Sequence, residues 1–330
     1  SIMNYVFIFT GEFGYEMFNW QGVVRKWCQK NKKSGDKVII CRRQGLENIY
    51  SFADYYFNIS QIESYNNTVA DCYRGYIWEK REDLHFDDWP IIGSGPVYTK
   101  LVEKIKKDIQ SLVLKSINKI DKWIWSHDYQ QVDGCHFGHG GPGGGSIYSD
   151  GDFLPNNVYK KINIPNVNDI KNQIQPKINI DLNQPFILCQ SGFRDGIGYL
   201  EKSRVKIDPS SIKYFNNSDI PILFLNFNSE RYWDSTSTFK ANYNTYSCNN
   251  FNEQACLILL SKHCVFFTEG DFRSHTYVPP LLGKDVHVVA SDEVLSLPSS
   301  SNTFWNKHIF TFGGQMYTYS YENLNKKIII

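Results

Sequence analysis

The 330-residue sequence lacks several features, and each absence argues against a class of protein. It has no charge excess, because 35 basic residues stand against 34 acidic ones and leave a formal net charge of +1. Proteins that bind nucleic acid through its phosphates usually carry a basic excess, so we expect no nucleic-acid partner. No apolar run approaches the ~20 residues that span a bilayer, and no signal-peptide pattern is present. We therefore expect a cytoplasmic protein without a transmembrane segment.

Paired cysteines are also missing. The sequence has eight cysteines, and none forms a CxxC pair. Tetrahedral zinc sites are usually built from ligands at short spacing, and disulfide frameworks belong to small secreted domains. The scattered cysteines therefore predict buried free thiols and no structural metal.

What the sequence does contain is two alternating β/α series. Residues 4–10 form a short apolar run typical of a buried strand, residues 15–29 have apolar side chains at helical spacing, and residues 37–41 form a second apolar run. Strand, glycine turn, helix and strand make a βαβ unit, which predicts a parallel sheet. After a stretch rich in Gly, Pro and Asn (residues 134–183), the pattern restarts. The elements expected there are strands over 185–190, 220–226, 263–268 and 285–290 and helices over 208–215, 252–262 and 273–282.

The length is about twice that of a usual single domain, which favours two domains. We therefore expect an α/β fold with two Rossmann-like domains facing a central cleft, over residues 3–170 and 171–330. Ligands of such sheets bind at the carboxyl ends of the strands.

The first loop at such an end covers Gly11, Glu12, Phe13, Gly14, Tyr15 and Glu16. Its G-x-x-G pattern is not the G-x-G-x-x-G of a dinucleotide site, and an acidic side chain on this turn would repel a pyrophosphate. A carboxylate at Glu12 suits a general base instead. For Glu16, an ordinary acidic residue favoured by the helix dipole is an equally good interpretation.

The second loop begins at Gln190 and Ser191, contains Arg194, and is followed by Lys202 and Arg204. Arginine binds a diphosphate through paired hydrogen bonds, and a loop after a strand would bring it to the ligand. The alternative is a surface loop with a salt-bridged arginine.

The third loop follows the strand over 263–268 and contains Glu269, Gly270, Arg273, Ser274 and His275. A glycine turn before a helix allows close approach of an anion. We expect Ser274 and the helix N-terminus to bind phosphate oxygens and Glu269 to bind ribose hydroxyls. A capping or core histidine is the alternative for His275.

Residues 252–290, with the Phe267-Thr268-Glu269-Gly270 turn, His275 and the Leu282-Gly283-Lys284 end, resemble the donor-binding segment of GT-B glycosyltransferases. The layout is similar to that of heptosyltransferase-type and fucosyltransferase-like enzymes. The resemblance implies that the C-terminal domain binds the donor and the N-terminal domain the acceptor. The turn with Glu12 matches the place where that class often carries a catalytic carboxylate.

Two other motifs compete with this interpretation. Asp150 and Asp152 form a D-x-D triplet, which is the metal-binding signature of the GT-A glycosyltransferase fold. A glycine-rich stretch over 138–145 contains His139 and could cradle a phosphate, but no clear strand precedes it and no Lys-Ser/Thr pair follows. We expect it instead to be an interdomain loop that closes over ligand, with a plain linker as the alternative.

The sequence therefore predicts a hexosyl- or pentosyltransferase that moves a sugar from a UDP-, GDP- or ADP-linked donor to a hydroxyl of a glycan acceptor. We expect inversion at the anomeric carbon and no required Mg²⁺ or Mn²⁺, because fixed cations would meet the leaving-group charge. The alternatives are a metal-dependent GT-A-type transferase, a sugar-nucleotide epimerase or hydrolase, and a non-catalytic carbohydrate-binding protein.

Overall fold

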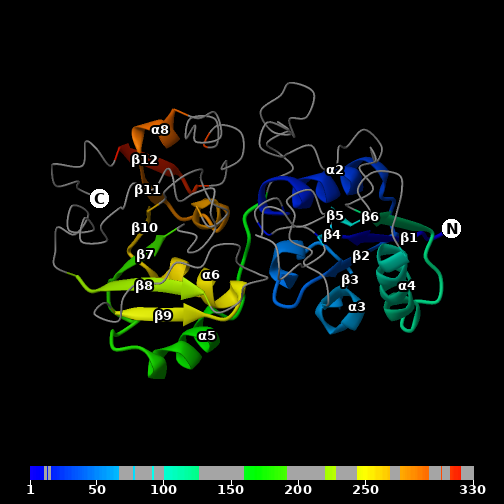
Figure 1. Cartoon of the computed structure of the whole chain (residues 1–330), viewed down its shortest axis with the longest axis horizontal. Coiled ribbons are helices and arrows are strands. Elements are labelled where there is room, and N and C mark those ends of the chain that lie inside the picture. Colours follow the sequence, from blue (N-terminus) through cyan, green and yellow to red (C-terminus); the bar gives the residue numbers. More distant parts are fainter. Residues whose placement is uncertain are drawn as a thin grey trace. The chain divides into compact units, whose positions relative to one another are not determined.

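The computed structural model describes residues 1–10, 13, 16–66, 77–78, 91–92, 100–125, 160–191, 220–227, 244–267, 276–296, 306 and 313–320. The chain divides into two compact units, Ser1–Val158 and Tyr159–Ile330 (Figure 1). This boundary precedes residue 170 because helix α5 (Val167–Ile174) packs on helix α6 (Phe251–Leu260) of the second unit. The Cys256 thiol also lies 3.4 Å from the Val167 carbonyl oxygen.

The first unit contains a four-stranded parallel sheet in the order β3-β2-β1-β6. Its strands are β1 (Asn4–Ile8), β2 (Lys37–Arg42), β3 (Tyr55–Asn58) and β6 (Lys122–Trp125). Its main helices are the π-helix η1 (Glu16–Trp20), α2 (Gln21–Asn31) and α4 (Lys100–Leu114). Shorter pieces are η2 (Glu47–Tyr50), η3 (Ile59–Gln61), α3 (Glu63–Asn66) and the antiparallel pair β4 (Ile77–Trp78) and β5 (Ile91–Ile92).

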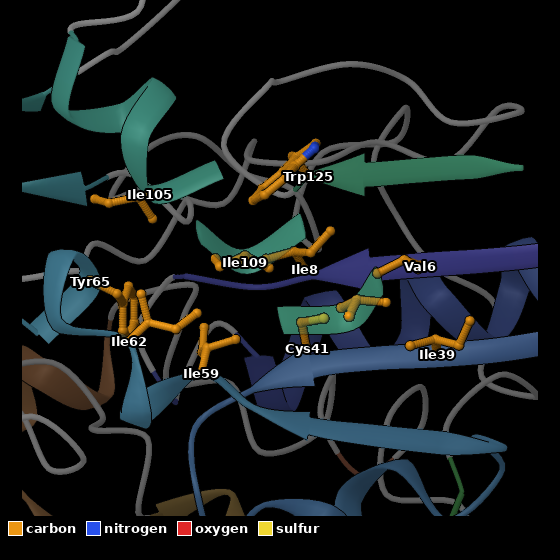
Figure 2. Packing of buried hydrophobic residues seen from close by; sticks show 11 residues of the cluster. Val6, Ile8, Ile39, Cys41, Ile59, Ile62, Tyr65, Ile105, Ile109 and Trp125 are labelled. Carbon is orange, nitrogen blue, oxygen red and sulfur yellow. The ribbon is translucent and has the colours of Figure 1, made fainter. Parts of the chain in front are cut away.

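Strand β1 is the centre of this unit because its side chains are buried on both faces of the sheet. On one face, the rings of Phe7 and Trp27 of α2 lie 5.2 Å apart between centroids. On the other face, Val6 and Ile8 join a cluster that includes Ile109 of α4 (Figure 2). Burial on both faces is typical of a parallel strand and explains the continuous apolar run in the sequence.

The second unit contains a six-stranded sheet in the order β12-β11-β10-β7-β8-β9, and every neighbouring pair is parallel. The strands are β7 (Ile187–Ser191), β8 (Ile222–Phe227), β9 (Thr245–Cys248), β10 (His263–Phe267), β11 (Val286–Ala290) and β12 (Met316–Ser320). Numbered within the unit, this is the 3-2-1-4-5-6 order of the Rossmann fold, and the first sheet has the 3-2-1-4 part of the same order. The expected α/β class with two Rossmann-like domains is confirmed.

The helix expected over 273–282 is the clearest difference from the sequence prediction. Within the described residues it is limited to α7 (Val278–Leu281), which begins after Tyr277. Pro279 and Pro280 have no N–H to donate to carbonyls of a preceding turn, so they favour a helix start rather than a helix interior. The expected stop is confirmed, since Gly283 has a φ of +80° directly after the helix.

The remaining helices of the described part are η7 (Gln175–Lys177) and α8 (Asp292–Leu295). No helix in the described part of the chain is long and apolar enough to cross a membrane.

Candidate functional site

The predicted loop at residues 11–16 lies directly after the central strand of the first sheet. Thr10 and Phe13 are buried, and Glu16 begins the π-helix η1. Gly11, Glu12, Gly14 and Tyr15 lie outside the described residues. The described residues thus fix both ends of the segment that carries Glu12.

Glu16 forms a fully buried ion pair with Arg42, the last residue of β2. Both side chains are 0% exposed. The Arg42 Nε atom donates to Glu16 Oε1 at 2.9 Å and to Oε2 at 2.8 Å, and Nη2 lies 2.8 Å from Oε1. The Tyr50 hydroxyl also donates to Glu16 Oε2. The carboxylate is therefore compensated by a guanidinium and a phenol from two other elements.

The same arginine contacts the residue that precedes the loop. The Arg42 guanidinium carbon lies 4.8 Å from the centroid of the Phe9 ring. The backbone N–H of Phe9 donates to the Cys41 carbonyl at 3.3 Å, which extends the β1–β2 pairing by one residue. Arg42 therefore contacts the chain on both sides of residues 10–15.

The electrostatics of this cluster follow from burial and from the charge pair. Burial is the largest single effect and would lower the pKa of Arg42, but Glu16, Tyr65 and Tyr50 together outweigh it, so the pKa is raised and the guanidinium stays charged. Burial, followed by the charge of Glu16, raises the pKa of Tyr50, so this phenol stays protonated as a donor.

A π-helix follows the predicted loop, and this is unusual at the start of a helix. The Gln21 amide in α2 donates to the Met17 carbonyl at 2.8 Å and so binds a carbonyl of the widened turn. Short π-helical turns occur frequently at functional sites.

In the second unit, the two predicted donor loops follow neighbouring strands. β7 and β10 pair with Ser191 opposite Phe267, so both strands end at the same level of the sheet. This pair is the topological switch point of the six-stranded order, where Rossmann-like sheets bind ligands. The two strand ends that precede the predicted donor loops are therefore neighbours in the sheet.

Below this switch point lies a buried network of neutral polar groups. Gln190 and Gln254 are both fully buried. The Gln254 amide donates to Gln190 Oε1 at 2.9 Å, and the Gln190 amide lies 3.7 Å from the Cys264 sulfur. These contacts join α6, β7 and β10, and they engage the amide of Gln190 inside the unit.

The other residues predicted to bind ligand lie outside the described residues. They are Arg194, Lys202, Arg204, Glu269, Gly270, Arg273, Ser274, His275, His139 and the pair Asp150 and Asp152. The side chain of Ser191 is likewise not described, although its backbone ends β7.

Sequence reasoning did not single out Arg42, Tyr50 or Gln254. Arg42 is the last residue of β2, and its charge directly after the apolar run Val38–Cys41 is the one sequence signal that points to it. Tyr50 and Gln254 lie in helical segments, where one polar or aromatic side chain does not stand out.

Within the described residues, no group of three or more His, Cys, Asp or Glu side chains is arranged to hold a metal ion. Six cysteines belong to this part of the chain, and all are free thiols; Cys41, Cys189, Cys248, Cys256 and Cys264 are buried, and Cys28 is half-buried. Burial raises the pKa of Cys41 and of Cys264, the latter to about 12, so both stay protonated and unreactive.

No protein-family model matches the sequence, and no curated protein matches it. Among solved structures, the chain is similar to a glycosyl transferase family 9 protein from Veillonella parvula, with 7% identity, 96% of this chain and 86% of that chain covered, and a TM-score of 0.46. It is also similar to the wall teichoic acid polymerase TagF (13% identity, 97% and 78% covered, TM-score 0.33). A third similar structure is the UDP-GlcNAc 2-epimerase from Neisseria meningitidis bound to UDP-GlcNAc (14% identity, 87% and 82% covered, TM-score 0.32). At these identities and TM-scores, the likenesses carry no conclusion about function.

Proposed function

We propose that the protein is a glycosyltransferase that moves a sugar from a nucleotide-sugar donor to a hydroxyl of a glycan acceptor. The observation that supports this most directly is the switch point of the second unit. Ser191 of β7 and Phe267 of β10 are register partners there, and the two segments with the predicted donor-binding residues follow directly. Two separate segments with cationic side chains would then meet a diphosphate at one edge of the sheet.

In this proposal the donor binds to the second unit. Arg194, Arg273 and Ser274 contact the diphosphate, with Lys202 or Arg204 adding positive charge, and Glu269 binds the ribose. The fixed cations stabilise the leaving nucleoside diphosphate, so the reaction requires no Mg²⁺ or Mn²⁺. The buried amide of Gln190 supports the end of β7 from inside.

The acceptor binds to the first unit, where Glu12 acts as general base. The acceptor hydroxyl gives its proton to Glu12 while its oxygen forms a bond to the anomeric carbon. The bond from that carbon to the diphosphate oxygen breaks on the opposite face, so the configuration inverts. The position of Glu12 after the central strand supports this role, because Thr10 and Phe13 on either side are buried.

The class of function is tested by thermal unfolding of the protein with UDP-, GDP-, ADP- and CMP-linked sugars, each with and without Mn²⁺. A ligand that binds only the native state increases the free energy of unfolding, by about 2.7 kcal/mol at a ligand concentration of 100 Kd. The unfolding temperature rises as a result. We expect one nucleotide series to stabilise the protein equally with and without Mn²⁺. If no nucleotide sugar raises the unfolding temperature, the proposal is overturned. A rise that requires Mn²⁺ would favour the metal-dependent GT-A-type transferase that uses Asp150 and Asp152.

The catalytic role is tested with Glu12→Gln, which keeps the side-chain size but removes the base. We expect turnover to fall by ~10²–10⁴-fold while the donor still raises the unfolding temperature. Glu63→Gln, an exposed carboxylate at the start of α3, is the matched control. Donor consumption that does not depend on acceptor would favour the epimerase or hydrolase, and glycan binding without any nucleotide effect would favour a carbohydrate-binding protein.

A further inference from the structure

The buried pair of Glu16 and Arg42 is placed at both ends of one short segment. Arg42 packs against the ring of Phe9 before the segment and binds the carboxylate of Glu16 after it. The six residues between Phe9 and Glu16 include Glu12. One side chain from β2 therefore holds the entry and the exit of the loop that leaves β1.

Stability alone does not account for this pair. Burying two charges costs more solvation free energy than their attraction often returns, and apolar residues of similar volume are frequently as stable. The solvation of Arg42 is not fully replaced, because its Nη1 and Nη2 atoms are buried and make no hydrogen bond among the described residues, although Nη2 lies within ion-pair distance of Glu16. What the charges supply is direction, since the Nε atom donates to both oxygens of the Glu16 carboxylate and Nη2 lies 2.8 Å from Oε1.

The surrounding groups reinforce this direction. Tyr50 donates to the same carboxylate from η2, and the π-helix η1 begins at Glu16 itself. Gln21 binds the Met17 carbonyl in the next turn. The backbone at the exit of the loop is therefore held by side chains from two further elements.

We propose that Arg42 is a positioning residue, which clamps Phe9 and Glu16 and so fixes the loop that presents Glu12 to the acceptor. The proposal rests on the proposed function, in which Glu12 is the general base. Displacing a catalytic group by about 1 Å can cost ~10²-fold in rate, so a clamp at both ends of its loop has a direct kinetic effect.

The decisive variant replaces the charged cluster with apolar groups of similar size, as Glu16→Leu/Arg42→Met/Tyr50→Phe. We expect this triple variant to fold and to retain its donor-induced thermal shift, while kcat falls ~10²-fold with little change in the donor KM. Hydrogen exchange of the peptide over residues 9–20 should become faster. A folded triple variant with wild-type kcat, or with unchanged exchange in this peptide, would overturn the proposal.

Two further variants cover the case in which the triple variant does not fold and test whether the effect is specific to Arg42. If the triple variant does not fold, Arg42→Lys keeps the charge but loses the paired geometry, and it should still lower kcat and speed up exchange over residues 9–20. Arg25→Met is the control, since Arg25 binds the Ile49 carbonyl and the Phe52 ring and has no recorded contact with Glu16 or Phe9. Arg25→Met should leave kcat and this exchange unchanged, and an equal loss of kcat there would also count against a specific clamp.

A double-mutant cycle separates this proposal from the base assignment. If Arg42 acts through Glu12, the triple substitution should cause little additional loss of kcat in a Glu12→Gln background. A full additional ~10²-fold loss would overturn the positioning role. If Glu12→Gln alone leaves kcat unchanged, the base assignment fails, and exchange over residues 9–20 still decides whether Arg42 holds the loop.

Discussion

The two Rossmann-like units bury polar groups near the carboxyl ends of their central strands, but they use opposite chemistry. In the first unit the buried groups are charged, with Glu16 at the start of η1 paired to Arg42 at the end of β2. In the second unit they are neutral, with the amides of Gln190 and Gln254 and the thiol of Cys264 joining α6, β7 and β10.

The difference follows from what each arrangement costs and supplies. A buried ion pair is expensive to form and very costly to break, but it fixes the direction of both partners. A buried amide pair costs less, fixes a contact and brings no charged group to the ligand edge. Under the proposed function, the charged cluster holds the loop with the base, and the neutral network leaves the field at the donor edge to the cations of the loops.

The largest expected effect comes from breaking the ion pair on one side only. Arg42→Met leaves the Glu16 carboxylate buried without its cation, so the free energy of unfolding should fall by about 3–5 kcal/mol. Urea unfolding followed by the fluorescence of the buried Trp20 and Trp27 would measure it. Adding Glu16→Leu should restore most of the loss, and a double variant as unstable as the single one would contradict this account.

The second unit also buries a histidine, His287, in its neutral form, and the pH dependence of stability should reveal this. His287 is 8% exposed, its Nδ1 atom lies 2.9 Å from the Tyr319 hydroxyl, and its ring lies 6.1 Å from that of His263. Burial, with a smaller contribution from His263 and against the opposing charge of Asp285, lowers the pKa of His287 from 6.5 to about 4.

Because the unfolded state binds this proton first, stability should be constant above pH 6.5 and fall as the pH decreases from about 6.5 to about 4, by roughly 1–3 kcal/mol. Unfolding free energies measured across this range would test the slope. His287→Phe keeps an aromatic ring against Tyr317 and should flatten it, whereas an unchanged slope would assign the effect to other groups.

Removing one amide from the neutral network should cost less than breaking the ion pair. Gln254→Leu leaves Gln190 Oε1 without the donor that binds it, so we expect a loss of about 1–3 kcal/mol in unfolding free energy. Gln190→Leu/Gln254→Leu removes both partners and should recover part of the loss. A cost equal to that of Arg42→Met would erase the distinction between the two units.

The smallest effect expected is that of the Tyr50 hydroxyl. Tyr50→Phe removes one donor from Glu16 but leaves the Arg42 pair, so the loss should be about 1.5 kcal/mol. Tyr55→Phe, which alters an exposed tyrosine, is the control for hydroxyl removal in the same unit. A loss as large as that of Arg42→Met would show that the phenol, and not the guanidinium, compensates the carboxylate.

The elements that the sequence predicted well are those with a continuous apolar run. β2, β10 and β11 were expected to within a residue or two, since parallel strands buried on both faces have unmistakable patterns. β3, β6, β9 and β12 were not expected. Each is only four or five residues long and carries polar side chains among its aromatic and apolar ones, so the pairing with neighbours, and not local pattern, makes it a strand.

For the predicted site, the ends of the preceding strands were predictable. The sequence placed strand ends near residues 10, 190 and 268, where glycine and polar residues interrupt apolar runs, and β1, β7 and β10 end at Ile8, Ser191 and Phe267. It assigned Gln190 to donor binding, although its amide is engaged with Gln254 and Cys264. Gln254 and Cys264 lie 64 and 74 positions after Gln190 in the chain, and contacts at such separations leave no local signature in the sequence.

The sequence by itself determined the alternation of strands and helices, and therefore two parallel α/β sheets, because hydrophobic periodicity is a local property of the chain. Only the tertiary structure decided that Arg42 reaches both Phe9 and Glu16, and that Ser191 and Phe267 end side by side. Such neighbours are set by strand order and register, which depend on how distant segments bury one another's apolar surface.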